Sequence, residues 1–171
     1  MTQPNTENRP VVVMSTTMGD ITIELFAAES PITTENFLQY VDSGHYNGTI
    51  FHRVIPNFMI QGGGFTENMV DRPTRDPIRN EAGNRISNRR STIAMARTNV
   101  IDSATAQFFI NVADNTALDG DGIRGGYAVF GRVIEGMDVV DRIVAVETTS
   151  RGPHDDVPAT PVVIREVRRQ S

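Results

Sequence analysis

The sequence of 171 residues contains no cysteine, no tryptophan and no lysine, so that all 16 of its basic residues are arginine. Without cysteine, disulfides, thiolate catalysis and zinc–thiolate sites are excluded. Without lysine, the chain can form neither a Schiff-base intermediate nor a Walker-A phosphate loop. It also lacks any apolar run near the roughly 18 residues that span a bilayer, so we expect no membrane segment.

Targeting signals and strong charge are missing as well. Residues 1–9 are polar and have no apolar stretch of the kind found in secretory signals, so we expect a cytoplasmic protein. The net charge of −5 argues against a nucleic-acid partner held by bulk charge. The chain is long enough to bury a core. We therefore predict a flexible N-terminal tail over 1–9 and a single domain over 10–171.

Two helices are predicted. Ser30 and Pro31 have the residue types of an N-cap and a first helical position, and Gly44 is a typical C-terminal stop. The second helix is expected over about 136–144, with apolar residues on its buried side.

Most of the remaining sequence is typical of short strands. Residues 11–13 and 21–25, joined by a Met-Gly-Asp turn, predict a hairpin. Further short apolar runs lie at 50–54, 58–61, 92–96, 107–112, 127–134 and 162–167. Many short strands with only two helices favour a mostly β fold that closes into a barrel, and closure without free edges suits a monomer. The polar segment 66–90 is predicted to be a long surface loop.

The segment 51–65 carries the most informative chemistry. In strands, a bend at Pro56 and Asn57 can bring Arg53, Met59 and Gln61 onto one face, because these three positions share a parity. A cation, a soft apolar group and an amide together suit a neutral, partly apolar ligand with carbonyl groups. Spacing alone leaves open the alternative that Phe58 and Met59 are ordinary core residues and Arg53 is a surface charge.

Other candidate sites have weaker support. The three histidines, His45, His52 and His154, have no metal-ligand spacing, so we expect no metal. We predict that His52 points away from Arg53 and is a hydrogen-bonded structural residue. The glycine triplet at 62–64 fits neither common phosphate-loop pattern, and Ser103 has no hydrolase motif around it.

Residues 51–63 read Phe-His-Arg-Val-Ile-Pro-Asn-Phe-Met-Ile-Gln-Gly-Gly. This block resembles the signature of the cyclophilin family, Phe-His-Arg-x-Ile-Pro-x-Phe-Met-x-Gln-Gly-Gly. Segments 92–97, 103–111 and 127–133 and the helix start at 136–140 resemble the family in the same order, so the likeness covers about residues 10 to 168. It implies a closed eight-stranded antiparallel β-barrel capped by two α-helices, and a peptidyl-prolyl cis/trans isomerase that needs no cofactor.

The resemblance also implies roles for individual residues. Arg53 matches the catalytic arginine. The apolar wall of the proline pocket is matched by Phe58, Met59, Phe109 and Leu118. Gln61 and Gln107 match polar contacts to the substrate. Ala96 and Arg97 match the strand that pairs with the substrate backbone. Tyr127 stands where many relatives have a pocket histidine.

The chain departs from many eukaryotic relatives at three positions: Arg97 replaces an asparagine, Ala117 a tryptophan, and Tyr127 the histidine. Two of these residues, Arg97 and Tyr127, resemble the bacterial branch of the family. Because the missing tryptophan contacts cyclosporin in sensitive relatives, we expect binding of that drug to be weak. We hypothesise that Arg97 adds charge at the pocket rim and favours acidic residues near the proline.

The expected partners are proline-containing peptides and unfolded or folding proteins, with broad specificity. One alternative from a different class stays open. A proline-binding chaperone or scaffold module would keep the barrel and bind partners with little turnover. The presence of Arg53 favours the enzyme, because loss of that residue would be the simplest sign of an inactive relative.

Overall fold

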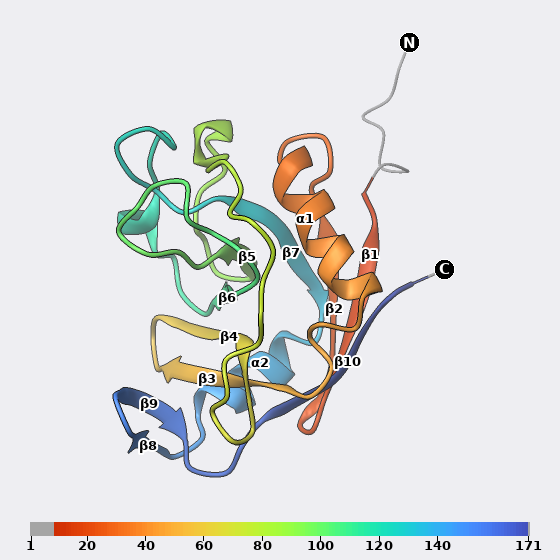
Figure 1. Ribbon diagram of the computed structural model, residues 1–171, viewed down its shortest axis with the longest axis vertical. Helices are drawn as coiled ribbons and strands as arrows, with labels where there is room; N and C mark the ends of the chain where they lie inside the picture. The colour runs from red at the N-terminus through yellow and green to blue at the C-terminus, as the bar shows by residue number, and fades with distance from the viewer. Residues whose placement is uncertain (1–8, 171) are drawn as a thin grey trace.

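The computed structural model describes residues 9–170 (Figure 1). Its elements, in chain order, are β1 (Val11–Thr16), β2 (Gly19–Leu25), α1 (Pro31–Asp42), β3 (Thr49–Ile55), β4 (Met59–Thr66), η2 (Ala82–Asn84), β5 (Thr92–Met95), β6 (Phe108–Asn111), η3 (Thr116–Leu118), β7 (Val129–Glu135), α2 (Met137–Val144), β8 (Thr148–Arg151), β9 (His154–Pro158) and β10 (Val163–Arg169). Residues 1–8, on which most of the predicted tail falls, lie outside the described residues. Arg9, the last residue of that predicted tail, donates to Glu24 at 3.1 Å.

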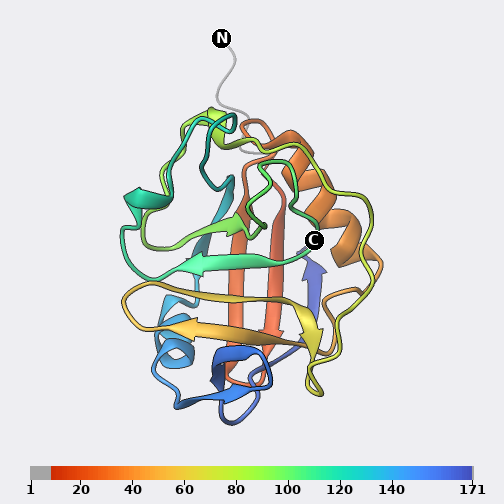
Figure 2. The same cartoon turned by 60° about the vertical axis from the view of Figure 1, so that its left-hand side comes forward.

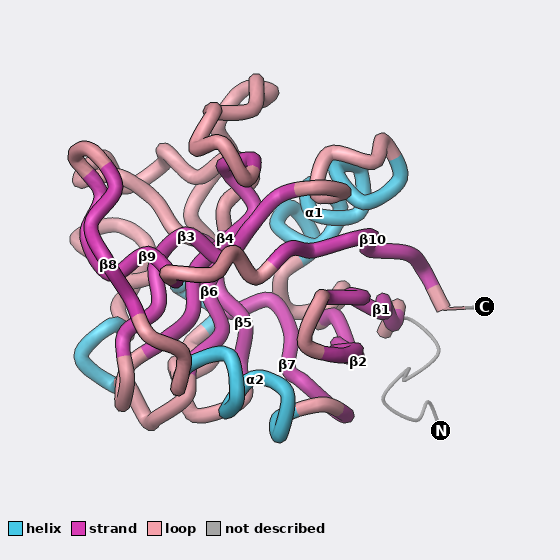
Figure 3. The backbone as a smooth tube through the Cα atoms, turned by 90° about the horizontal axis from the view of Figure 1, so that it is seen from below, coloured by secondary structure: helices cyan, strands magenta, loops and turns pink. Residues whose placement is uncertain are grey.

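Eight strands form a closed barrel in the order β1-β10-β3-β4-β6-β5-β7-β2, and every neighbouring pair is antiparallel. Strands β3 to β6 cross the direction of β1, β2 and β10 (Figure 2), and the view from below shows the ring that they make (Figure 3). The predicted eight-stranded antiparallel barrel with two α-helices is confirmed. Closure leaves none of these eight strands with an unpaired edge.

The barrel interior is filled by aromatic side chains. Phe37 of α1 lies 5.1 Å from both Tyr46 and Phe130 between ring centroids, and Phe108 meets it edge-on at 5.9 Å. All four are fully buried. α1 packs near one end of the molecule and α2, through Val140 and its neighbours, near the other (Figure 1). Such rings bury large apolar areas, so this cluster supplies much of the stability of the fold.

Helix α1 begins at Pro31 as predicted, but the capping differs from the prediction. The Ser30 hydroxyl makes no cap hydrogen bond and donates instead to the Val129 carbonyl at 2.8 Å. The exposed helical N–H groups are bound by the Glu81 carboxylate, which accepts from the Thr33 amide at 2.6 Å. A carboxylate at a helix N-terminus also interacts favourably with the helix dipole. The loop 66–90 therefore contributes to the fold through Glu81.

The hairpin of β8 and β9 was not predicted from the sequence. Its strands are mostly exposed and carry no alternating apolar pattern, so periodicity gives no signal there. The hairpin packs against β3. Neither helix of the described chain has the length and apolar character needed to cross a membrane.

Tyr46 offers a direct test of the core. Its hydroxyl is buried and donates to the Ala106 carbonyl at 2.7 Å. We expect Tyr46→Phe to lower the free energy of unfolding by about 1–3 kcal/mol, because the carbonyl is left buried without its partner. Urea denaturation measures this, with an unchanged m-value showing that only stability has altered. Equal midpoints for the two proteins would contradict the assigned hydrogen bond.

Candidate active site

Strands β3 and β4 bring a guanidinium and an amide side by side on the outside of the barrel. Arg53 and Gln61 are direct partners across the antiparallel pair, and Arg53 Nη1 donates to Gln61 Oε1 at 3.4 Å. The turn between the strands contains Asn57 with a positive φ of 62°, a conformation that asparagine tolerates better than most residues. The guanidinium of Arg53 is exposed, whereas Gln61 is half-buried.

Next to this pair, the outer face of the barrel carries a second hydrophobic cluster, separate from the interior. Met59 and Phe109 are 2% and 4% exposed although they lie on the outside. They are buried because half-buried side chains cover them: Phe58, Leu118 and Tyr127. Phe109 pairs with Gln61 of β4 on one side and with Ala94 of β5 on the other, so the sheet fixes the floor of this cluster.

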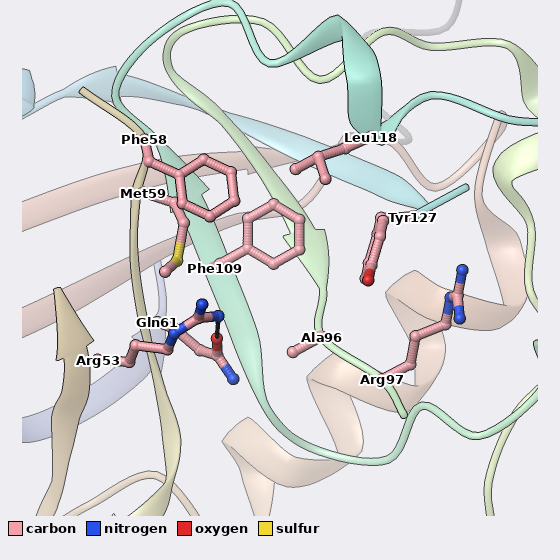
Figure 4. Close-up of a pocket in the computed structure, with 9 residues that line it drawn as sticks. All are labelled: Arg53, Phe58, Met59, Gln61, Ala96, Arg97, Phe109, Leu118 and Tyr127. Carbon is pink, nitrogen blue, oxygen red and sulfur yellow. Dashed lines mark hydrogen bonds between the residues drawn. The ribbon is translucent and has the colours of Figure 1, made fainter. Parts of the chain in front are cut away.

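Together these groups line an open pocket of about 130 Å³. Its lining is Arg53, Phe58, Met59, Gln61, Ala96, Arg97, Phe109, Leu118 and Tyr127. Figure 4 shows Arg53 and Gln61 on one side of the pocket, together with Phe58 and Met59, Tyr127 and Arg97 on the other side, and Phe109 between the two sides. The structure thus brings together nine of the ten residues named from the sequence. An apolar floor with few polar groups at its margin suits a small apolar ring.

The tenth residue, Gln107, does not line this pocket. Its Oε1 accepts a hydrogen bond from Gln61 Nε2 at 3.0 Å, so it continues the row that starts at Arg53. It lines an adjoining hollow of about 160 Å³ with Gln61, Ala96, Arg97, Thr98, Ser103 and Thr105. Of its hydroxyl residues, only Ser103 stands out in the sequence, and there solely as a candidate hydrolase nucleophile. No catalytic motif marks Thr98 or Thr105, whose only signal is that Thr98 directly follows, and Thr105 lies within, a segment that resembles the family.

The glycine triplet has a structural explanation. A Cβ atom at Gly64 would lie 2.4 Å from Gln107 Nε2, so glycine leaves room for the Gln107 side chain. Gly63 has a φ of +92°, and a Cβ there would meet Phe108 and Tyr46 at 2.8 Å. The triplet therefore lets the β4 backbone approach the barrel interior and Gln107 closely.

Arg97 is held firmly at the pocket rim. Its Nε donates to the Gly126 carbonyl at 3.0 Å and its Nη1 to the Thr98 carbonyl at 2.8 Å. The guanidinium carbon lies over the Tyr127 ring, 4.4 Å from its centroid. This stacking combines a cation–π contact with fixed geometry. Arg97 thus supports the Tyr127 wall of the pocket, a contact that the sequence did not reveal.

His52 precedes Arg53 in β3 and points to the opposite side, where it packs against Phe65 and His154. It is buried, as expected for a structural residue. The expected side-chain hydrogen bond is not found at its buried Nδ1, which has no partner within residues 9–170. Burial lowers the pKa of His52 from 6.5 to about 4, and nearby His154 and Arg53 act in the same direction. The imidazole is therefore neutral at pH 7.

Known proteins of similar sequence agree with the geometry of the site. A family model described as cyclophilin type peptidyl-prolyl cis-trans isomerase matches residues 11–169. The chain belongs to this family. The isomerase class and the function expected from the resemblance are thereby confirmed at the level of the cyclophilin family.

Individual relatives are close in sequence. The chain is 56% identical to a peptidyl-prolyl cis-trans isomerase of Acinetobacter baylyi, covering 94% of this chain and 86% of the relative. It is 52% identical to peptidyl-prolyl cis-trans isomerase B of Escherichia coli, covering 92% and 98% of the two chains. Both relatives are bacterial, in agreement with the bacterial-branch features of the sequence.

Solved cyclophilins have the same fold. A crystal structure of a cyclophilin type isomerase from Cryptosporidium parvum superposes with a TM-score of 0.79 at 26% identity, covering 95% of this chain and 98% of that one. A second crystal structure of the Cryptosporidium protein, obtained in the presence of the dipeptide Ala-Pro, gives a TM-score of 0.78, with coverage of 94% and 99%.

The lowered pKa of His52 predicts a pH dependence of stability. Since the folded state resists protonation while the unfolded chain accepts a proton at its ordinary pKa, stability is full above pH 6.5 and falls toward pH 4. The loss from this residue reaches up to about 3 kcal/mol. We expect His52→Gln to remove most of this fall in urea denaturation between pH 7 and 4. His154→Gln is the matched control, and most of the fall in the free energy of unfolding between pH 7 and 4 should persist in it. Identical pH profiles for wild type and His52→Gln would refute the assignment.

Proposed function

We propose that Arg53 is the catalytic residue of this isomerase and that the apolar pocket beside it holds the proline ring of an X–Pro substrate. The observation that carries the proposal is the position of an exposed guanidinium at the margin of an apolar pocket of small volume. A proline ring seated on Met59 and Phe109 would place its imide nitrogen near that margin.

The reaction requires no reactive group. Amide resonance opposes rotation about the C–N bond with a barrier of about 18–20 kcal/mol, and X–Pro bonds exchange over tens to hundreds of seconds without a catalyst. A protein lowers this barrier when it binds the twisted amide better than either planar isomer. No bond is broken, so a nucleophile, a metal and a cofactor are not needed in this mechanism.

Arg53 suits this task chemically. In the twisted amide the nitrogen becomes pyramidal and regains its lone pair, which a guanidinium N–H can bind. Gln61 accepts a hydrogen bond from Arg53 and so helps to orient it. Gln61, Gln107 and the strand end at Ala96 would bind the carbonyl groups and backbone of the substrate. The apolar wall, including Phe58, Leu118 and Tyr127, would hold the ring while the acyl side turns.

Magnitudes show that Arg53 does not act alone. Acceleration by about four decades requires roughly 5–6 kcal/mol. One charge-assisted hydrogen bond contributes about 1.5–3 kcal/mol. Desolvation and shape complementarity in the pocket supply the remainder, so both the guanidinium and the apolar wall are needed.

The direct test is the cis–trans exchange of a short X–Pro peptide, followed by NMR. We expect Arg53→Ala to reduce the catalysed rate by about two decades, as for loss of one donor to a developing lone pair. Arg165→Ala, an exposed arginine of β10 outside the pocket, is the matched control and should be as active as wild type. Peptide binding without acceleration by the wild type would instead favour the proline-binding module.

Arg97 is proposed to set a charge preference at the pocket rim. Two of its N–H donors are used by protein carbonyls, but the guanidinium keeps its charge beside the pocket. We expect Arg97→Asn to lower the rate ratio between peptides with acidic and basic residues next to the proline by about two- to threefold at low salt, and less at high salt. An unchanged ratio would show that Arg97 serves only to support Tyr127.

The proposed substrates are proline-containing segments of unfolded or folding proteins, because the pocket makes few demands beyond the proline ring. Cyclosporin is proposed to bind weakly, since the exposed Ala117 offers no ring next to Leu118. A monomeric protein acting in the cytoplasm remains our proposal from the sequence.

A further inference from the structure

A buried group of asparagines lies behind the proline pocket. Asn88 and Asn111 are fully buried, and Asn115 is half-buried beside them. None of the three lines the pocket. Burial of three polar amides is favourable only when their hydrogen bonds are satisfied, which makes their partners informative.

At one end, this network binds the Phe58 side of the pocket. Asn115 Nδ2 donates to the Phe58 carbonyl at 2.7 Å and to Asn111 Oδ1 at 2.8 Å. Asn111 Nδ2 donates in turn to Asn88 Oδ1 at 3.2 Å and to Thr92 Oγ1 at 2.9 Å. The three amides therefore form one connected chain that is anchored on β5 and β6.

At the other end, the network binds the opposite wall. Asn88 Nδ2 donates to the Tyr127 carbonyl at 3.3 Å and to Asp119 Oδ1 at 3.0 Å. The backbone N–H of Asn88 donates to the same Asp119 oxygen at 2.7 Å. The backbone N–H of Leu118 donates to the Asn115 carbonyl at 2.9 Å. Phe58 and Tyr127 stand on opposite sides of the pocket in Figure 4.

These wall residues lie outside the strands, so few backbone hydrogen bonds hold them. The Phe58 carbonyl accepts from the Val112 N–H, and the Tyr127 N–H donates to the Leu118 carbonyl, each at 3.0 Å. Phe58 lies in the turn before β4, Leu118 in η3, and Tyr127 in the loop before β7. Loops are less rigid than strands unless other contacts fix them. Hydrogen bonds in a buried, fully connected network are strong and directional, so they can fix a backbone position to a fraction of an ångström.

We propose that Asn88, Asn111 and Asn115 form a positioning network that sets the distance between the Phe58 and Tyr127 walls and thereby the affinity of the pocket for proline. The inference rests on the proposed role of the pocket in holding the proline ring. The network touches neither Arg53 nor Gln61, which lie on β3 and β4. Disturbing it should therefore weaken substrate binding more than the rotation step.

Asn115→Asp is the sharpest variant. Both side-chain hydrogen bonds of Asn115 are donated by Nδ2, and an ionised carboxylate of the same size can donate neither. Asn84→Asp is the matched control: Asn84 is also half-buried and donates through Nδ2 to Ser30 Oγ at 2.6 Å and to the Glu29 carbonyl at 3.3 Å. Those partners do not line the pocket.

NMR exchange with an X–Pro peptide separates affinity from the rate on the enzyme. We expect Asn115→Asp to raise KM by about five- to tenfold while kcat stays within about twofold, and Asn84→Asp to leave both within about twofold. Should Asn115→Asp not fold, Asn115→Ala removes the same donor without adding charge, and the same shift in KM is expected.

Three results would overturn the proposal: an unchanged KM in the folded Asn115 variant, an equal rise in Asn84→Asp, or a loss confined to kcat. Each of these results differs from what failure of the proposed function would give. If the proposed function were wrong, the wild type would not accelerate exchange, or Arg53→Ala would retain full activity, and neither observation depends on the asparagine variants.

Discussion

Closure of the barrel is the constraint on which the rest of the structure depends. Once eight strands are hydrogen-bonded in a ring, each side chain on them must point inward or outward, because neighbouring positions alternate. The inward-facing side chains contribute to the aromatic cluster around Phe37, a residue that comes from α1. The outward positions of β3 to β6 are then free to build a site whose floor is as rigid as the barrel itself.

The site uses this rigidity unevenly. Arg53, Gln61, Met59 and Phe109 stand on strands that are paired on both sides, so the polar margin and the floor are fixed by the sheet. The walls formed by Phe58, Leu118 and Tyr127 lie outside the strands. Their positions depend on side-chain hydrogen bonds and on the stacking of Arg97 over Tyr127. In a catalyst that acts by shape and charge rather than by a reactive group, the separation of these walls decides how tightly the proline ring is held, and the arginine acts on the twisted amide.

Much of the fold was accessible from the sequence. The alternation in 21–25 and the short apolar runs predicted the barrel strands, and Pro31 and Gly44 bracketed the first helix. The family resemblance supplied the site residues, and nine of them line one pocket. The β8–β9 hairpin could not be predicted from the sequence, because its exposed strands have no alternating pattern of apolar residues. His52 was expected to be hydrogen-bonded, yet its Nδ1 has no partner within residues 9–170, because parity predicts which side a residue faces but not what it meets there.

The sequence by itself determined which residues alternate, where the chain turns, and which chemical groups are available: a neutral-ligand surface with an arginine, and no thiol or lysine. Only the tertiary structure decided the strand order, the Glu81 carboxylate at the start of α1, and the asparagine network behind the pocket. Asn115 and Phe58 are 57 residues apart, and Thr33 and Glu81 are 48 apart. Local patterns record the conformation of neighbouring residues, whereas contacts at such separations exist only after the barrel has closed and brought the distant segments together.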